Sequence, residues 1–151
     1  MALKLLNVAL VAIYAIGSGL WVSTGDSWYR ALNAPSWQPP DWVFGLIWPY
    51  NFLILGIAGW LAISNLSKSW GATWLIIFAI SIICALSWAN LFYIQHNILA
   101  ASIALALVAV LTLPLLFIAY KTNLILGIAL TPYQLWVTTA TLLSFSYARL
   151  N

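Results

Sequence analysis

Long apolar runs divided by short polar breaks dominate the pattern of this chain. Five runs predict helices, at residues 3–22, 42–64, 70–95, 98–120 and 124–149. Each holds the roughly 20 residues that a helix needs to cross a bilayer. A transmembrane barrel would instead show short segments of alternating apolar and polar residues. The pattern therefore predicts an all-α integral membrane protein, a five-transmembrane-helix bundle that forms a single domain over residues 1–151.

The composition agrees with a chain whose solvent is mainly lipid. Hydrophobic residues make up 65% of it and charged residues only 5%, whereas soluble domains average about 25% charged residues. The lipid bilayer is therefore the first expected partner. The five basic residues are scattered singly and form no basic stripe, so nucleic-acid binding is not expected.

Charged residues fall only at the ends of the predicted helices or between them. Five spans would place Lys4, Lys68 and Lys121 on one side of the membrane, and Arg30 and Arg149 on the other. The positive-inside rule then weakly favours a cytoplasmic N-terminus. Away from their ends, the spans contain no Asp, Glu, Lys or Arg of the kind that marks ion paths and proton relays. This argues against a proton pump or an ion-coupled transporter.

The usual chemistry of catalytic and metal sites is absent from the sequence. His96 is the single histidine, Cys84 is the single cysteine, and glutamate does not occur. One histidine cannot hold a metal by itself, and no paired carboxylates or nucleophile triad can be assembled. We therefore expect no metal site, no required cofactor and no catalytic residue, and an enzyme is the less favoured interpretation.

Aromatic residues form the most distinctive pattern. The chain has ten Trp, seven Tyr and six Phe. Residues three or four apart share one face of a helix, and this spacing defines three stripes. They comprise Phe44, Trp48 and Phe52; Ala85, Trp88 and Phe92; and Tyr133, Trp136 and Ala140. Facing one another, such stripes could enclose a pocket for a flat apolar ligand. Ordinary core packing explains the spacing equally well.

The connection between the first two runs combines tryptophan with proline. The last part of this connection and the start of the second run read PSWQPPDWVFGLIW over residues 35–48. This exceeds what a belt of interfacial aromatic residues requires. Proline restricts the chain and lowers the entropic cost of ordering a loop over a ligand. We therefore expect this connection to act as the lid of a pocket.

Three motifs together resemble the TspO/MBR family, the tryptophan-rich sensory proteins and the translocator protein. They are PSWQPPDWVFGLIW at 35–48, LSWANLFY at 86–93 and PYQLW at 132–136, followed by Ala140. The resemblance covers essentially the whole chain. It implies five transmembrane helices, usually in a homodimer, and a pocket beneath the connection between the first two helices.

The resemblance also implies ligands and site residues. Members of the family bind porphyrins, sterols and synthetic lipophilic ligands, so a porphyrin or haem-type tetrapyrrole is an expected ligand. The implied ligand-binding residues are Trp37, Trp42, Phe44, Trp48, Phe52, Trp88, Phe92, Tyr133, Trp136 and Ala140. Leu143, Tyr147 and Arg149 fit a weak sterol motif, although Tyr147 and Arg149 at a helix end are also plain interface anchors, which we favour.

Several positions depart from the family pattern. Phe52 stands where tyrosine is usual, and Ala85 and Ser144 stand where asparagine is usual. A pocket that loses polar groups orients its ligands less well, so we expect relaxed selectivity.

Three functions remain open from the sequence. The favoured one is a membrane receptor or transport-type protein for flat lipophilic ligands. The alternatives are an enzyme of light-dependent porphyrin degradation and a structural membrane subunit whose pocket has degenerated. The membrane of residence is a bacterial cell envelope or an organelle membrane.

Overall fold

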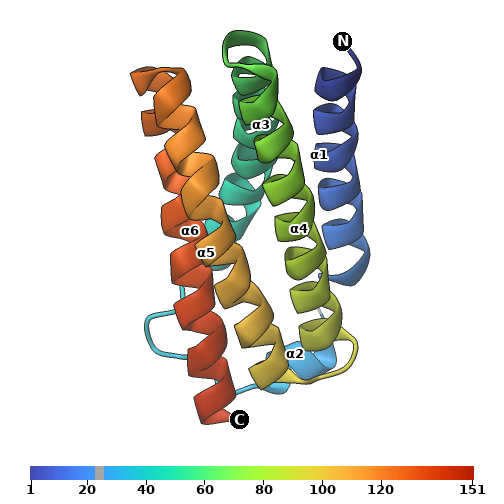
Figure 1. The fold of residues 1–151 in the computed structure, drawn as a ribbon. Helices are drawn as coiled ribbons and strands as arrows, with labels where there is room; N and C mark the ends of the chain where they lie inside the picture. Colours follow the sequence, from blue (N-terminus) through green and yellow to red (C-terminus); the bar gives the residue numbers. More distant parts are fainter. Residues whose placement is uncertain (23–25) are drawn as a thin grey trace.

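The computed structural model describes residues 1–22 and 26–151, and within these ranges the chain contains helices and no strand (Figure 1). The start of the expected lid, residues 23–25, lies outside the described residues. The helices are α1 (Ala2–Trp21), α2 (Ser27–Ala31), α3 (Asp41–Asn65), α4 (Lys68–Tyr93), α5 (Ile98–Thr122) and α6 (Leu124–Leu150).

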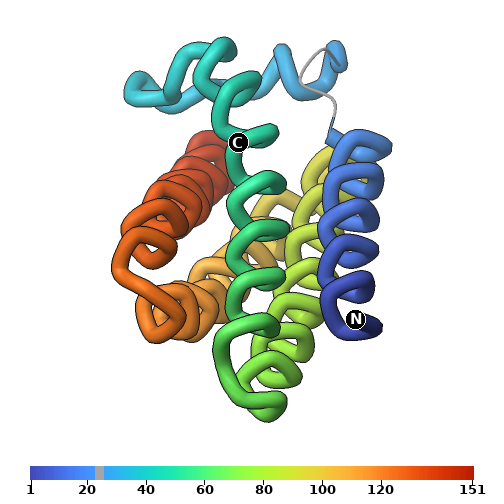
Figure 2. The backbone as a smooth tube through the Cα atoms, turned by 90° about the horizontal axis from the view of Figure 1, so that it is seen from above, coloured from blue at the N-terminus to red at the C-terminus, as the bar shows by residue number. Residues whose placement is uncertain are grey.

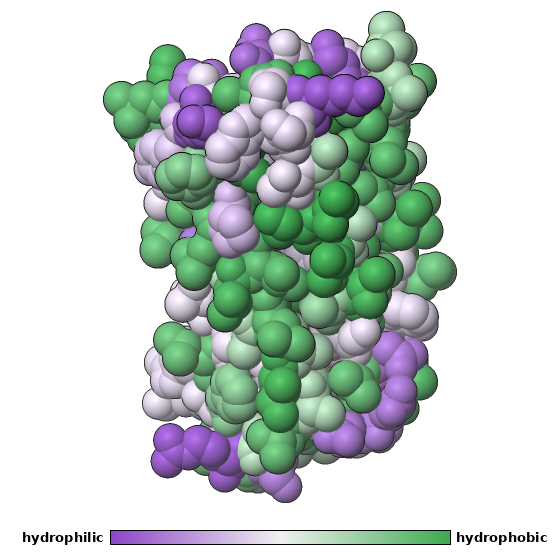
Figure 3. Space-filling model, viewed as in Figure 1, coloured by the Kyte–Doolittle hydropathy of each residue, from purple (hydrophilic) through white to green (hydrophobic). Residues whose placement is uncertain are grey.

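The five long helices run alongside one another, and the two termini lie at opposite ends of the bundle (Figure 1). Apolar side chains cover the middle of the surface, and polar side chains gather toward its two ends (Figure 3). Four helices, α1, α3, α4 and α5, are long and apolar enough to cross a membrane by length and composition. The all-helical membrane fold expected from the sequence is therefore confirmed. Helix α6, which corresponds to the fifth predicted span, is less apolar than these four helices.

Helix α6 is less apolar because hydroxyl-bearing residues interrupt it. Several of these hydroxyls donate to carbonyls of their own helix: Thr131 to Gly127, Thr138 to Gln134, Thr141 to Val137 and Ser146 to Leu142, at 2.8–2.9 Å. A side chain bonded in this way adds little unsatisfied polar surface. The low hydropathy of α6 therefore overstates the cost of placing this helix in lipid.

The short helix α2 is the element that the apolar pattern did not predict. Asp26 begins it by accepting a hydrogen bond from the backbone N–H of Trp28 at 3.3 Å. An aspartate at this N-cap position satisfies one of the free N–H groups of the first turn. The helix has only five residues, too few to produce an apolar periodicity. It lies at the end of the bundle that also carries the C-terminus (Figure 1).

A buried polar clamp holds three helices together. Asn7 of α1 is fully buried; its amide donates to the carbonyl of Gly56 on α3 (3.0 Å), and its oxygen accepts the indole N–H of Trp74 on α4 (2.9 Å). A Cβ atom at Gly59 would overlap both the Asn7 and the Trp74 side chains. Glycine at this position therefore allows the close approach that the clamp needs.

The small residues Ser81, Ala85 and Ala89 of α4 are buried within the single chain. This series therefore serves intramolecular packing, as small residues do where membrane helices approach closely. Seen end-on, α3 lies between α1 on one side and α6 on the other (Figure 2). The α3–α6 side of the bundle is where the candidate site lies.

Candidate ligand-binding site

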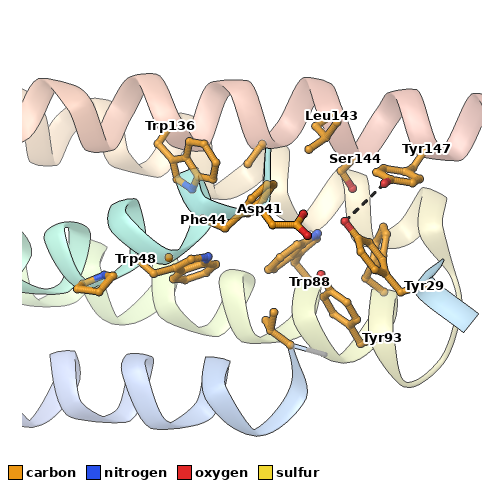
Figure 4. Close-up of a pocket in the computed structure, with 15 residues that line it drawn as sticks. Tyr29, Asp41, Phe44, Trp48, Trp88, Tyr93, Trp136, Leu143, Ser144 and Tyr147 are labelled. Carbon is orange, nitrogen blue, oxygen red and sulfur yellow. Dashed lines mark hydrogen bonds between the residues drawn. The ribbon is translucent and has the colours of Figure 1, made fainter. Parts of the chain in front are cut away.

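A cavity of about 500 Å³ lies between α3, α4 and α6 (Figure 4). Its volume falls within the range of small-molecule sites. Fifteen residues line it. They are Val22, Tyr29, Asp41, Phe44, Gly45, Trp48, Pro49, Trp88, Phe92, Tyr93, Trp136, Ala140, Leu143, Ser144 and Tyr147.

One end of the cavity is apolar. The ring of Phe44 on α3 lies edge-on against the indole of Trp136 on α6, with centroids 5.2 Å apart and an interplanar angle of 83°. Trp48 lies one turn further along α3, on the same side of the cavity as Phe44 (Figure 4). Edge-to-face pairs are a favoured aromatic geometry, so this wall is both rigid and suited to flat apolar rings.

The other end is polar. The hydroxyl groups of Tyr147 and Tyr29 are 3.5 Å apart, and the Asp41 carboxylate projects into the same region (Figure 4). Ser144 also lines this end, and its hydroxyl lies 2.8 Å from the hydroxyl of Ser102 on α5. The cavity is therefore amphipathic along its length, with aromatic faces at one end and oxygen atoms at the other.

Between these ends, one side-chain group and one backbone group lack their usual hydrogen-bond partners. The indole N–H of Trp88 is buried and makes no hydrogen bond within the described chain. On α3, Pro49 has no N–H to donate to the Gly45 carbonyl four residues earlier, and both residues line the cavity. A buried donor without a partner is costly, so a ligand could gain by accepting a hydrogen bond from Trp88; Gly45 is exposed, so its carbonyl carries no such cost.

Helix α2 and the connection after it are tied down over the polar end. The Tyr147 hydroxyl donates to the side-chain oxygen of Gln38. Earlier in the connection, the backbone N–H of Asn33 donates to the side chain of Asn151 at 2.8 Å. In α2, the ring of Trp28 stacks on His96, with centroids 3.8 Å apart. These contacts join α2 and the connection to the C-terminal end of the chain and to the α4–α5 turn, as a lid requires.

The structure brings together six of the ten ligand-binding residues expected from sequence. These are Phe44, Trp48, Trp88, Phe92, Trp136 and Ala140. They come from the three aromatic stripes, so the stripes on α3, α4 and α6 do face one another across a common cavity.

The other four lie outside the lining. Trp37 and Trp42 are exposed, with 47% and 67% of their surface accessible. Asp41 faces the cavity, and the next residue on a helix points about 100° away, which turns Trp42 outward. Phe52 lies on the α1 side of α3, edge-on to Tyr14 at 5.2 Å. Tyr133 is 2% exposed and packs in the main core.

The weak sterol motif is divided between two environments. Leu143 and Tyr147 are buried and line the cavity, while Arg149 is exposed near the C-terminus. Tyr147 is therefore part of the cavity wall, whereas a plain interface anchor would be exposed at the helix end. Spacings of three and four residues along α6 place Leu143 and Tyr147 on the same face as Ala140.

Of the three departures from the family pattern, only Ser144 lines the cavity, where it supplies a hydroxyl in place of the usual asparagine amide. Phe52 and Ala85 do not line the cavity, so these two departures leave its lining unchanged. Further polar groups come from Tyr29, Asp41 and Tyr147. Helical spacing offered a signal for Asp41, which precedes Phe44 by three residues and Trp48 by seven. No such signal was available for Tyr29, because it depends on how α2 folds back.

A second hollow of about 650 Å³ lies between α1 and α3. Its lining is apolar apart from the indole of Trp60, and it includes Val8, Val11, Ala12, Phe52 and Gly56. Lacking convergent polar groups, it is less suited to orient a specific ligand. Within residues 1–22 and 26–151, no three His, Cys, Asp or Glu side chains gather closely enough to hold a metal ion.

Comparison with known proteins finds similarity along nearly the whole chain. The family model described as "TspO/MBR family" matches residues 6–150. The protein CrtK of Rhodobacter capsulatus is 28% identical over 100% of this chain and 95% of its own length. The tryptophan-rich protein TspO of Chlorobaculum tepidum is 27% identical, covering 93% of this chain and 90% of its own. The human translocator protein is 27% identical, covering 90% and 82%.

Proposed function

This chain belongs to the TspO/MBR family, and from that premise we propose that it is a membrane receptor or transport-type protein for flat lipophilic ligands. The proposed site is the cavity between α3, α4 and α6. One observation carries the proposal: Phe44, Trp48 and Trp136 form an aromatic wall opposite the polar groups of Asp41 and Tyr147. Sites that orient small ligands combine apolar walls with a few convergent polar groups in this way.

Tetrapyrroles and sterols are the proposed ligand classes, as the family resemblance implies. Both are large and rigid and have wide apolar faces. The cavity volume of about 500 Å³ admits part of one such ring system, with its apolar face against Phe44, Trp48 and Trp136. The lid over the Asp41 end, held by Gln38 and Tyr147, would open to admit the ligand and close over it.

Two further features belong to the same proposal. Helix α6 is the fifth membrane span, because its length of 27 residues suffices and four of its hydroxyls donate to carbonyls of the same helix. The protein is a homodimer, as the resemblance implies. Its dimer contact would not use the small-residue series of α4, because those residues are buried within one chain.

Light-dependent degradation of a bound porphyrin is the second candidate function. It is favoured by the presence of three indoles, Trp48, Trp88 and Trp136, around one cavity. A bound, excited porphyrin would lie in contact with these oxidisable rings.

Ligand titration in detergent tests the proposal. Acridine, neutral at mildly alkaline pH, and protoporphyrin IX are titrated separately while tryptophan fluorescence is followed. We expect saturable quenching that is weaker in Trp48→Leu and Trp136→Leu. Quenching that never saturates, or that is the same in all three proteins, contradicts the proposal. Illumination of the porphyrin complex separates the two functions, since only degradation produces a Trp-dependent loss of porphyrin absorbance.

A further inference from the structure

The charges around the cavity are unbalanced. Asp41 is the single charged residue among the fifteen that line it, and the lining of the described chain contains no Lys, Arg or His. Arg30 and Arg149 belong to elements at the same end of the bundle, but both are exposed and neither lines the cavity. A ligand in this cavity therefore meets one negative charge and no positive side chain.

The remaining lining groups make the electrostatic potential in the cavity more negative. Aromatic faces carry negative potential and attract cations, and eight of the fifteen lining residues are Phe, Trp or Tyr. The N-terminal amides of α3 offset part of the Asp41 charge, but they do not supply a positive group to a ligand in the cavity.

We infer that this site selects flat lipophilic ligands that carry a positive charge, over those that carry a carboxylate. The inference rests on the proposed function and narrows its ligand class. The cation lies at the outer end beside the Asp41 carboxylate, and the apolar ring extends between Phe44, Trp48 and Trp136. The indole N–H of Trp88, unpartnered in the described chain, donates to an acceptor atom of the ligand between the two ends.

Carboxylated ligands are repelled where cationic ligands are attracted. A propionate placed at the outer end would face Asp41 without a basic partner, which disfavours binding by like-charge repulsion. Such a ligand can bind only with its carboxylates projecting past the lid into solvent. Porphyrin esters and cationic porphyrins should therefore bind better than free porphyrin acids.

A set of three acridines tests this selectivity, because they share one ring system and differ in charge. The probes are N-methylacridinium, neutral acridine and acridine-9-carboxylate, titrated by tryptophan quenching in a non-ionic detergent. We expect the cation to bind about tenfold more tightly than the anion, given the usual strength of cation–π and partly exposed charge contacts. Asp41→Asn should bring the ratio of the two dissociation constants close to one, and Asp41→Glu should keep it.

Asp26→Asn is the matched control, because Asp26 is the other acidic residue of the chain and does not line the cavity. It should keep the wild-type ratio; an equal change in both Asn variants would mean that overall charge, not this site, sets the preference. An anion that binds as well as the cation overturns the inference. If neutral acridine also fails to bind the wild-type protein, the proposed function itself has failed, so the two failures are distinguishable.

Discussion

The ring of Phe44 on α3 meets the indole of Trp136 on α6 edge to face, with centroids 5.2 Å apart. This contact connects two helices that are far apart in sequence, and it forms the apolar wall of the cavity. The same two helices supply Asp41 and Tyr147 to its polar end. The relative position of α3 and α6 therefore determines the shape of the whole site.

Replacing Trp136 with leucine should weaken binding of neutral acridine by up to about tenfold, because an aromatic contact contributes roughly 0.5–1.5 kcal/mol. Trp42→Leu is the control. This residue belongs to the tryptophan- and proline-rich motif, yet it is 67% exposed and outside the lining. Fluorescence titration should show wild-type affinity for Trp42→Leu. Equal losses in the two variants would place the ligand at the outer motif instead.

Removing the Asn7 side chain should destabilise the bundle. Asn7→Leu leaves the buried indole N–H of Trp74 without its acceptor, at a cost of about 1–3 kcal/mol. Thermal unfolding in detergent measures this loss. Adding Trp74→Phe to Asn7→Leu removes the unpaired donor as well, so the double variant should lose less than the sum of the two single variants. Strictly additive losses would show that the two side chains do not act together.

The hydrogen bond between Tyr147 and Gln38 should control how fast ligands enter and leave. Gln38→Leu removes the acceptor of the Tyr147 hydroxyl, and one neutral hydrogen bond contributes about 1 kcal/mol. We expect association and dissociation rates in stopped-flow fluorescence to rise together by about fivefold, leaving the dissociation constant nearly unchanged. Gln95→Leu makes the same substitution outside the cavity lining and should leave both rates unaltered. Unchanged rates in Gln38→Leu would mean that the connection does not act as a lid.

The fifth span makes a prediction about topology. In a Cys84→Ser background, Thr122→Cys and Asn151→Cys place single thiols at the two ends of α6. If α6 crosses the membrane, a membrane-impermeant maleimide added outside sealed, uniformly oriented vesicles should label only one of them. Detergent should then expose the other. Labelling of both thiols in intact vesicles would show that α6 does not cross.

The five long helices could be predicted from sequence because each is a long, mainly apolar run without charges in its middle, and lipid requires such runs to be helical. The site could be predicted only in part. Helical spacing placed Phe44, Trp48 and Trp136 on inward-facing stripes, but spacing cannot say where a stripe turns toward another neighbour. Phe52 continues the α3 stripe and nevertheless faces Tyr14 of α1.

The polar end of the site was harder to foresee. Tyr29 reaches the cavity because α2 folds back across the end of the bundle, and that depends on a five-residue helix with no apolar period. Trp42 was expected in the site because the family resemblance implies it. Its orientation is set by Asp41, which occupies the inward-facing position one residue earlier. Local chemistry was visible in the sequence, whereas the direction of each side chain depended on packing.

Photolabelling tests the central claim most directly. An azidoacridine is bound to the protein in detergent, activated by light, and its attachment sites are mapped by mass spectrometry, with excess acridine as competitor. The account predicts competable labelling at residues that line the α3–α4–α6 cavity, such as Trp48, Trp88 and Trp136. Labelling concentrated in the second hollow, between α1 and α3, at Val8, Val11 or Phe52, would contradict it. Labelling that acridine does not reduce would also contradict it.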